Sequence, residues 1–256
     1  MSTSIHVSAG QVAASLALVA LAAAISFWRK ADLERDIGIA TVRSFVQLTA
    51  IGFAIELIFE ADTIWLVFAL LAVMVVFGAL TARSRAKRVP DSFWPLLIAL
   101  AVAAATTLGL VVALGVFEAT ARYLVPVGGM VIGNAMTASA VALNRLGDEM
   151  ADSRGKIEAT LALGATAQEA ASPFVRRALR SGMITLVDST KTTGLIFFPG
   201  TMVGMLLAGA DPTDAVRLQL ILLYALLGSV AIAGLVATTL AYRNFFTSAE
   251  QLREVP

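Results

Sequence analysis

Long apolar stretches separated by short polar ones dominate the pattern along this chain. Five stretches contain no charged residue at all, over residues 7–28, 63–82, 92–117, 123–144 and 218–242. Two more, over residues 37–59 and 181–210, are equally long but contain ionisable side chains. Because a helix needs about 20 mostly apolar residues to cross a bilayer, the pattern predicts an all-α, polytopic transmembrane bundle of seven spans. Residues 1–256 are expected to form a single transmembrane domain.

Composition supports a membrane location and excludes several kinds of chemistry. Hydrophobic residues make up 58% of the 256 and charged residues 14%, whereas soluble domains carry about 25% charged residues. The chain has no cysteine and one histidine, His6, so thiolate or histidine-rich metal sites are excluded. The net charge of +1 argues against a nucleic-acid partner. We therefore expect a multi-pass protein of the cell inner or plasma membrane, with the lipid bilayer as its surroundings.

The basic residues predict the orientation of the spans. When the connections are assigned to alternate sides, 15 of the 19 Lys and Arg residues fall on one side and two on the other. Basic residues accumulate on the cytoplasmic side of membrane proteins. The amino terminus is therefore expected outside and the carboxyl terminus in the cytoplasm.

The one sizeable polar segment, residues 145–182, is expected in the cytoplasm. It is interrupted by Gly155, Gly164 and Pro173. We expect a short helix near residues 156–163, a turn at Gly164 and a second helix leading into the sixth span. Ser172 followed by Pro173 fits the N-cap and first residue of that second helix.

Nucleotide hydrolysis by the chain itself is not expected. A phosphate-binding loop needs the pattern G-x-x-x-x-G-K-[ST]. The only Gly–Lys pair, Gly155–Lys156, is followed by Ile157, and Met150 stands where the first glycine should be. No catalytic residue is therefore assigned, and we do not expect an enzyme.

The polar segment contains a pattern that resembles the coupling loop of ABC importer permeases, E-A-A-x-x-x-G. Here it consists of Glu158, Ala159, Thr160 and Gly164, with Thr160 in place of the second alanine. A short helix with small residues on one face can lie in a groove of a separate ATPase subunit, and the glycine lets the backbone reverse behind it. The pattern is short, so an ordinary interfacial loop is the alternative.

Several longer stretches carry a resemblance to a known family. They are RSFVQL at 43–48, IEATLALGAT at 157–166, VDSTKTTGLIFFPGTMVGMLLAGADP at 187–212, and a P-x-x-G-M-x-x-G-N-A-M pattern formed by Pro126, Gly129, Met130, Gly133, Asn134, Ala135 and Met136. Over nearly its whole length the chain resembles the FetB-type ABC permease family, which is linked to iron export in bacteria and includes plant relatives in aluminium tolerance. One departure is Thr201, where the family usually has the first of two adjacent methionines.

The resemblance implies a permease that exports a small substrate, with a metal ion such as iron as the expected cargo. It implies two permease copies, a homodimer, and a separate ABC ATPase subunit that holds ATP and Mg, while this chain holds no cofactor. The residues that would contact the ATPase are Glu158, Ala159, Leu161, Gly164 and Ala165. The coupling pattern alone would suggest import. Another cargo, such as a nucleotide sugar, and an ATP-independent carrier or channel are the alternatives.

Ionisable and polar residues inside the spans mark a candidate translocation path, because such residues are costly in lipid. Arg43 and Gln47 share one helix face, although Arg43 can also extend to the headgroups. Asp188 and Lys191 are spaced to form an ion pair, either structural or a gate. Together with residues discussed next, the candidate path comprises Arg43, Gln47, Met130, Asn134, Met136, Asp188, Lys191, Pro199, Gly200, Met202 and Met205.

Glycine and proline positions predict how two of the spans pack and bend. Gly129-x-x-x-Gly133 and Gly200-x-x-x-Gly204 have the spacing that lets helices approach closely. Pro199 removes a helical hydrogen bond in mid-span. Freed carbonyls are tolerated at that depth only where they are buried or line a cavity, so a broken helix is expected beside the path.

The methionines of these two spans are candidate metal ligands. Met130, Met136 and Met202 carry thioethers, which suit soft ions such as Cu(I). Iron would favour oxygen or nitrogen donors such as Asn134 or Gln47. Methionine is also common core filler, so both interpretations stay open.

Overall fold

Helices make up nearly all of the structure, a computed structural model that describes residues 8–61 and 63–253. Within these residues the only β structure is two isolated bridges, so the predicted all-α class is confirmed. Five of the described helices, α1, α3, α4, α5 and α9, are long and apolar enough to cross a membrane. Spans in the second and sixth stretches, the total of seven and the side of each terminus stay predictions. His6 lies outside the described residues.

The chain divides into two compact units, and the first contains α1 (Ala9–Arg29) and α2 (Glu34–Ala61). Ser8 caps α1, since its hydroxyl accepts from the Gln11 N–H while the Gln11 side chain accepts from the Ser8 N–H. The Ser26 hydroxyl accepts from the Leu33 N–H and so braces the short connection to α2. The first predicted span matches α1, and the second lies inside α2.

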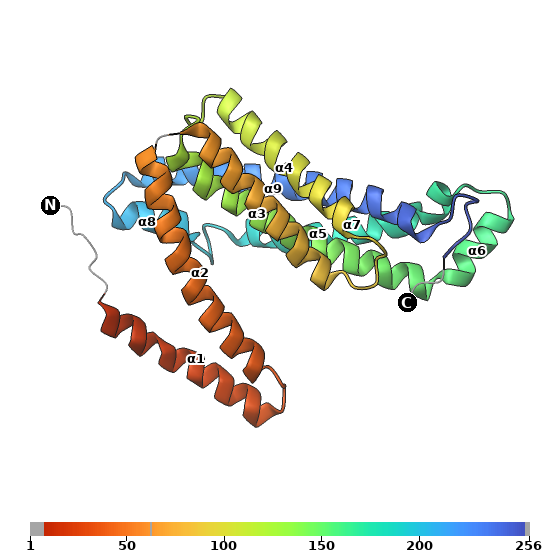
Figure 1. Ribbon diagram of the computed structural model, residues 1–256, viewed down its shortest axis with the longest axis horizontal. Helices are drawn as coiled ribbons and strands as arrows, with labels where there is room; N and C mark the ends of the chain where they lie inside the picture. The colour runs from red at the N-terminus through yellow and green to blue at the C-terminus, as the bar shows by residue number, and fades with distance from the viewer. Residues whose placement is uncertain (1–7, 62, 254–256) are drawn as a thin grey trace. The chain divides into compact units, whose positions relative to one another are not determined.

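The second unit is built around α5 (Ala121–Asp152), which packs against four other helices. These are α3 (Ile64–Arg85), α4 (Phe93–Ala113), α7 (Ala167–Thr192) and α9 (Pro212–Ala241). Figure 1 shows α6 (Arg154–Ala162) at one end of this unit and α8 (Gly200–Leu207) at the other. After α9 the chain forms a short 3-10 helix, Tyr242–Phe245, and returns toward α6. A single permease domain over residues 1–256 stays a prediction.

A glycine sets the crossing of α5 and α7. A Cβ atom added at Gly182 would lie 2.6 Å from the carbonyl oxygen of Ala138 and 2.8 Å from the Cβ of Ala142. By contrast, a Cβ added at Gly133 or Gly204 meets no atom of the described chain within 4 Å. Within the described residues, the close approach of α5 and α7 thus depends on Gly182, and neither Gly133 nor Gly204 of the spaced pairs makes such a contact.

The sixth predicted span is two helices rather than one. The first, α7, ends at Thr192, and α8 begins at Gly200, directly after Pro199. Between them, the Gly194 N–H donates to the Phe197 carbonyl at 2.8 Å, and Gly194 has a φ of +87°. The predicted break at Pro199 and Gly200 is therefore confirmed, and it extends over residues 193–199.

The start of α7 differs from the prediction. Ser172 and Pro173 do not begin the helix; Pro173 lies inside it. The N-cap is Thr166, whose hydroxyl accepts from the Glu169 N–H while the Glu169 carboxylate accepts from the Thr166 N–H. This reciprocal pair satisfies two otherwise unpaired N–H groups, so the N-cap lies at Thr166, six residues before Ser172.

Candidate coupling surface and translocation site

The predicted short helix and turn of the polar segment are confirmed as α6 and Gly164. Ile157 is 1% exposed and anchors α6 on the second unit. On the outer face, Arg154 Nε and Glu158 Oε1 form an ion pair at 2.8 Å. Gly164 has a φ of +89°, a left-handed conformation that favours glycine. The chain therefore reverses after α6 at a fixed position.

A groove of about 650 Å³ lies beside this turn. Glu158, Leu161, Gly164 and Ala165 line it, together with the tail residues 249–252. Ala159, the fifth predicted coupling residue, is exposed on α6 outside the lining. The structure thus brings four of the five residues to one concave surface.

Leu163 stands at the edge of this surface and was missed by the sequence interpretation. Its side chain is 89% exposed, the largest exposure among the large hydrophobic residues described. Leu163 is the C-cap of α6, directly before Gly164. At this position the sequence alone does not indicate whether the side chain points outward or inward. A single exposed apolar residue is ordinary on a protein surface, but Leu163 adjoins the groove and therefore extends the candidate coupling surface.

The tail that forms the far wall of the groove is held in place by hydrogen bonds. Phe246 and Leu252 pair as an antiparallel bridge. The Glu250 carboxylate accepts from the Ala167 N–H at 2.9 Å, and Arg154 Nη1 donates to the Arg253 carbonyl at 3.3 Å. The tail therefore bridges α6 and the start of α7.

Two carboxylates, those of Glu250 and Glu169, lie at the amino end of α7. Negative groups are stabilising there because unpaired N–H groups point outward. The Thr166 backbone N–H, followed by the Thr166 hydroxyl, holds the pKa of Glu169 below its usual range. Both carboxylates thus fix the position at which α7 leaves the coupling surface.

An ion cluster braces α5 against α7 close to the same end. Glu149 of α5 is 9% exposed and accepts from Nε and Nη2 of Arg177 at 2.9 and 2.6 Å. Arg145, one turn before Glu149, pairs with the other carboxylate oxygen. The Arg177 guanidinium also lies 4.9 Å from the Phe174 ring centre. These contacts connect the coupling surface to the central helix.

A small cleft of about 160 Å³ lies between α5, α7 and α9; its lining is mostly apolar but includes four side chains with amide or hydroxyl groups, and we call it the polar cleft. Asn134 and Thr137 of α5 line it opposite Thr185 and Ser189 of α7. Asn134 Nδ2 donates to the Met130 carbonyl at 2.9 Å. Within the described residues, no hydrogen bond occupies Asn134 Oδ1 or the hydroxyls of Thr185 and Ser189. The cleft therefore offers neutral oxygen donors at the depth of the apolar helices.

Asp188 and Lys191 form the ion pair that their spacing predicts. Lys191 Nζ lies 2.9 Å from Asp188 Oδ1, and both side chains are more than half exposed. Asp188 adjoins Ser189 in the last turns of α7. The pair lies just beyond the polar cleft, while a gating role stays a prediction.

The predicted methionine ligands do not all face one another. Met130 Sδ lies 3.9 Å from the hydroxyl of Thr201, at the start of α8. Met136 is six residues further along α5, about 240° around the helix, and its Cβ lies 4.0 Å from a Cβ added at Gly78 of α3. Met202 and Met205 are half-buried on α8. The structure brings Met130 to α8 and leaves Met136 on another face; metal binding stays a prediction.

Arg43 and Gln47 lie on one exposed face of α2, as their spacing predicts. With Gly38, Ile39, Val42 and Val46 they line a shallow groove of about 490 Å³. Apart from Arg43 and Gln47, the residues that line this groove are apolar. Besides Arg35 in its first turn, α2 thus carries one cation, Arg43, within its apolar stretch.

Comparison with known proteins gives a match over nearly the whole chain. The model of the uncharacterised protein family UPF0014 matches residues 9–246. The chain belongs to this family. It is 38% identical to the rice UPF0014 membrane protein STAR2 over 242 residues, which cover 94% of this chain and 85% of that relative.

Two further relatives have names that refer to aluminium sensitivity and to iron export. The chain is 37% identical to the Arabidopsis thaliana protein ALUMINUM SENSITIVE 3 over 94% of its length and 88% of the relative. It is 34% identical to the probable iron export permease protein FetB of Escherichia coli K12 over 94% of its length and 93% of that relative. No solved structure matches significantly. The chain is therefore a multi-pass membrane protein of a family that includes a named permease.

Proposed function

We propose that this chain is the membrane-spanning permease subunit of an ABC transporter, driven by ATP hydrolysis in a separate subunit. The observation that carries the proposal is the surface formed by α6, Leu163 and the carboxy-terminal tail. A short helix with an exposed apolar residue beside a groove of about 650 Å³ suits docking of another protein. The name of FetB, a probable iron export permease, agrees with it.

The mechanism follows from how this surface is connected. α6 contacts α7 and α5, and Glu149 with Arg177 joins α5 to α7. A displacement of α6 by an ATPase would therefore be transmitted along α7, which also lines the polar cleft. ATP and Mg would bind the ATPase, while Glu158, Leu161, Gly164 and Ala165 of this chain would contact it.

Co-purification in mild detergent tests the ATPase partner. The wild-type chain is expected to retain a stoichiometric protein that contains a Walker A sequence. Leu163→Glu should abolish retention, because it places a charge at the edge of the proposed contact while the 89% exposed side chain makes few contacts within the chain. Gly155→Trp is the matched control: a Cβ there meets open space, and Gly155 lies outside the groove. Recovery of well-folded wild-type chain without any ATPase would favour the carrier or channel alternative.

Gly164→Trp is a less suitable variant than Leu163→Glu. The φ of +89° at Gly164 strains any residue with a side chain. Loss of the partner in that variant would not separate a disturbed turn from a lost contact. Leu163 carries no such conformational demand.

We propose export of a small substrate, with a metal ion such as iron as the expected cargo. The cleft of about 160 Å³ lined by Asn134, Thr185 and Ser189 supports a small substrate with affinity for oxygen donors. A nucleotide sugar is the second candidate, and it would require a much wider cleft. Two copies of the chain are expected to form the complete path.

Transport by the chain and its ATPase in proteoliposomes tests the cargo. Fe²⁺ should move only with ATP, and the double variant Asn134→Ala/Ser189→Ala should slow it. Thr106→Val is the control, since Thr106 is an exposed residue of α4 whose hydroxyl already donates to the Val102 carbonyl at 2.6 Å. ATP-driven movement of a nucleotide sugar, with no movement of Fe²⁺, would replace the metal cargo and leave the ABC assignment intact.

A further inference from the structure

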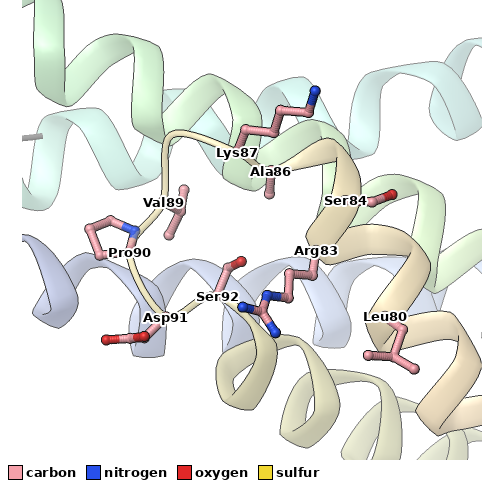
Figure 2. A pocket seen from close by; sticks show the side chains of 9 residues that line it. All are labelled: Leu80, Arg83, Ser84, Ala86, Lys87, Val89, Pro90, Asp91 and Ser92. Atoms are coloured by element: carbon pink, nitrogen blue, oxygen red, sulfur yellow. The ribbon is translucent and has the colours of Figure 1, made fainter. Parts of the chain in front are cut away.

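A second pocket, separate from the coupling groove in its lining residues, lies in the connection between α3 and α4. Its volume is about 550 Å³, and Figure 2 shows the nine residues that line it. Two are cationic, Arg83 and Lys87, and two carry hydroxyls, Ser84 and Ser92. One carboxylate, that of Asp91, also belongs to the lining, and Figure 2 shows it directed away from the Arg83 guanidinium.

The cations of this pocket have no acidic partner in the part of the chain that the structure describes. Arg83 and Lys87 form no salt bridge there, whereas the neighbouring Arg88 is paired with Asp148 at 2.8 Å. Both side chains are exposed. With two cations against the one carboxylate of Asp91, the pocket lining has a net positive charge.

Ser92 adds a buried donor to the same pocket. It is 3% exposed and occupies the N-cap position of α4, yet its hydroxyl makes no capping hydrogen bond and has no other partner among the described residues. In Figure 2 the hydroxyl points to the side on which Arg83 lies. The first N–H groups of α4 follow directly and contribute partial positive charge. Together these groups are suited to an anion such as a phosphate.

An apolar groove begins further along the same two helices. Its volume is about 680 Å³, and its lining is entirely apolar, with Val76 and Leu97 nearest the cationic pocket. On α4 the small residues Ala101, Ala105 and Gly109 leave space between the helices. Such a groove between two lipid-facing helices is suited to a hydrocarbon chain.

The pocket and the groove lie along one face of α3. Val76 of the groove is followed at helical spacing by Leu80 and Arg83 of the pocket, and the seven residues from Val76 to Arg83 span about 10 Å. Trp94, at the start of α4, is 64% exposed, and exposed tryptophan is typical of the headgroup level of a membrane. A cationic pocket at headgroup level thus leads into an apolar groove at acyl-chain level.

We infer that this face binds an anionic phospholipid, with its phosphate at Arg83 and Ser92 and one acyl chain in the groove between α3 and α4. Lys87, whose ammonium points away from these two groups in Figure 2, adds positive charge at the same level. A zwitterionic lipid would match the groove but not the net positive charge, and a helix of a partner would match the groove alone. The inference is independent of the ATPase and of the cargo.

Native mass spectrometry of the purified full-length chain in detergent tests the inference. The probes are dioleoyl phosphatidylglycerol, dioleoyl phosphatidylcholine and glycerol 3-phosphate, titrated separately while bound copies are counted. Phosphatidylglycerol should bind saturably at one copy per chain and raise the thermal unfolding midpoint. Phosphatidylcholine and glycerol 3-phosphate should do so only at much higher concentration, because each matches half of the site.

Matched variants separate this site from general attraction to a basic surface. Arg83→Gln/Lys87→Gln should weaken phosphatidylglycerol binding about twentyfold, since a cation near the headgroups contributes about fivefold. Arg85→Gln removes a charge from the same turn outside the lining and should leave binding unchanged. Ala105→Phe fills the groove and should weaken binding, whereas Val102→Phe, exposed on α4 but outside the groove, should not.

Four results would overturn the inference. Equal binding of phosphatidylglycerol and phosphatidylcholine would remove the headgroup site. Equal loss in Arg85→Gln and in the double variant would leave only nonspecific surface charge. Glycerol 3-phosphate binding as tightly as phosphatidylglycerol would reduce the site to a phosphate pocket without an acyl chain. Retained binding by Ala105→Phe would have the same meaning.

Discussion

The two ends of the second unit differ in how they are held. At the α6 end, ion pairs and hydrogen bonds cross between elements, including those of Glu149 with Arg177 and of Glu250 with the Ala167 N–H. At the α8 end, residues 193–210 contain no charged residue, and none of the α8 residues is buried. The α6 end is therefore held by polar contacts within the chain, whereas α8 has no buried residue to hold it.

The difference indicates which end could transmit a displacement of α6 by an ATPase and which end could change position. A braced end can transmit a displacement of α6 to the central helix α5. An end without internal braces can change position as the path opens. Both ends expose a leucine to a similar extent, 89% for Leu163 and 86% for Leu195, so the contrast lies in their supports rather than in apolar exposure.

The largest expected effect concerns the crossing of α5 and α7. Gly182→Leu would force a side chain against the Ala138 carbonyl and should lower the free energy of unfolding by about 3 kcal/mol. Gly204→Leu on α8 should cost little, because a Cβ there meets no described atom. Thermal unfolding in detergent measures both. Equal destabilisation by the two variants would remove the contrast between the ends.

The ion cluster gives the next effect. Glu149→Gln should destabilise the chain by about 2 kcal/mol, because the two arginines would lose a charged hydrogen-bond acceptor that is largely buried. Asp188→Asn, in an exposed pair, should change stability by less than about 1 kcal/mol. Chemical denaturation compares them. A more severe effect from Asp188→Asn would make the open end the better braced of the two.

A smaller effect is expected at the carboxy-terminal tail. Glu250→Gln weakens the charged acceptor for the Ala167 N–H and should cost about 0.5 kcal/mol at most. Hydrogen exchange should accelerate at the first turn of α7 and not along the rest of that helix. Unchanged exchange at Ala167 would show that the tail does not hold the start of α7.

Local signals in the sequence predicted much of this arrangement, and contacts between distant residues were missed. The α6 turn and the break before α8 follow from Gly164 and Pro199, because glycine and proline act on their own backbone. The brace at Glu149 was missed because Arg177 lies 28 residues away. The tail contact was missed for the same reason, since Glu250 and Ala167 are 83 residues apart.

Other features had sequence signals that could be interpreted in more than one way. Thr185 and Ser189 were missed as cleft residues because helical hydroxyls often bond to their own backbone, and only the packing distinguishes those that do not. The Ser172–Pro173 pair had an acceptable start pattern, but the reciprocal pair of Thr166 and Glu169 satisfied more N–H groups. The second and sixth predicted spans carry charges, so hydropathy alone does not decide whether they cross the membrane.

Cysteine cross-linking tests the central claim, that the α6 end receives an ATPase. The chain has no cysteine, so Leu163→Cys and Leu195→Cys each create one thiol at similarly exposed positions, the first directly after α6 and the second between α7 and α8. A thiol-anchored photoreactive cross-linker is applied in membranes, and the products are identified by mass spectrometry. The account predicts a Walker A protein joined to Leu163→Cys and not to Leu195→Cys. An ATPase joined to Leu195→Cys alone, or to neither variant in a folded chain, would contradict it.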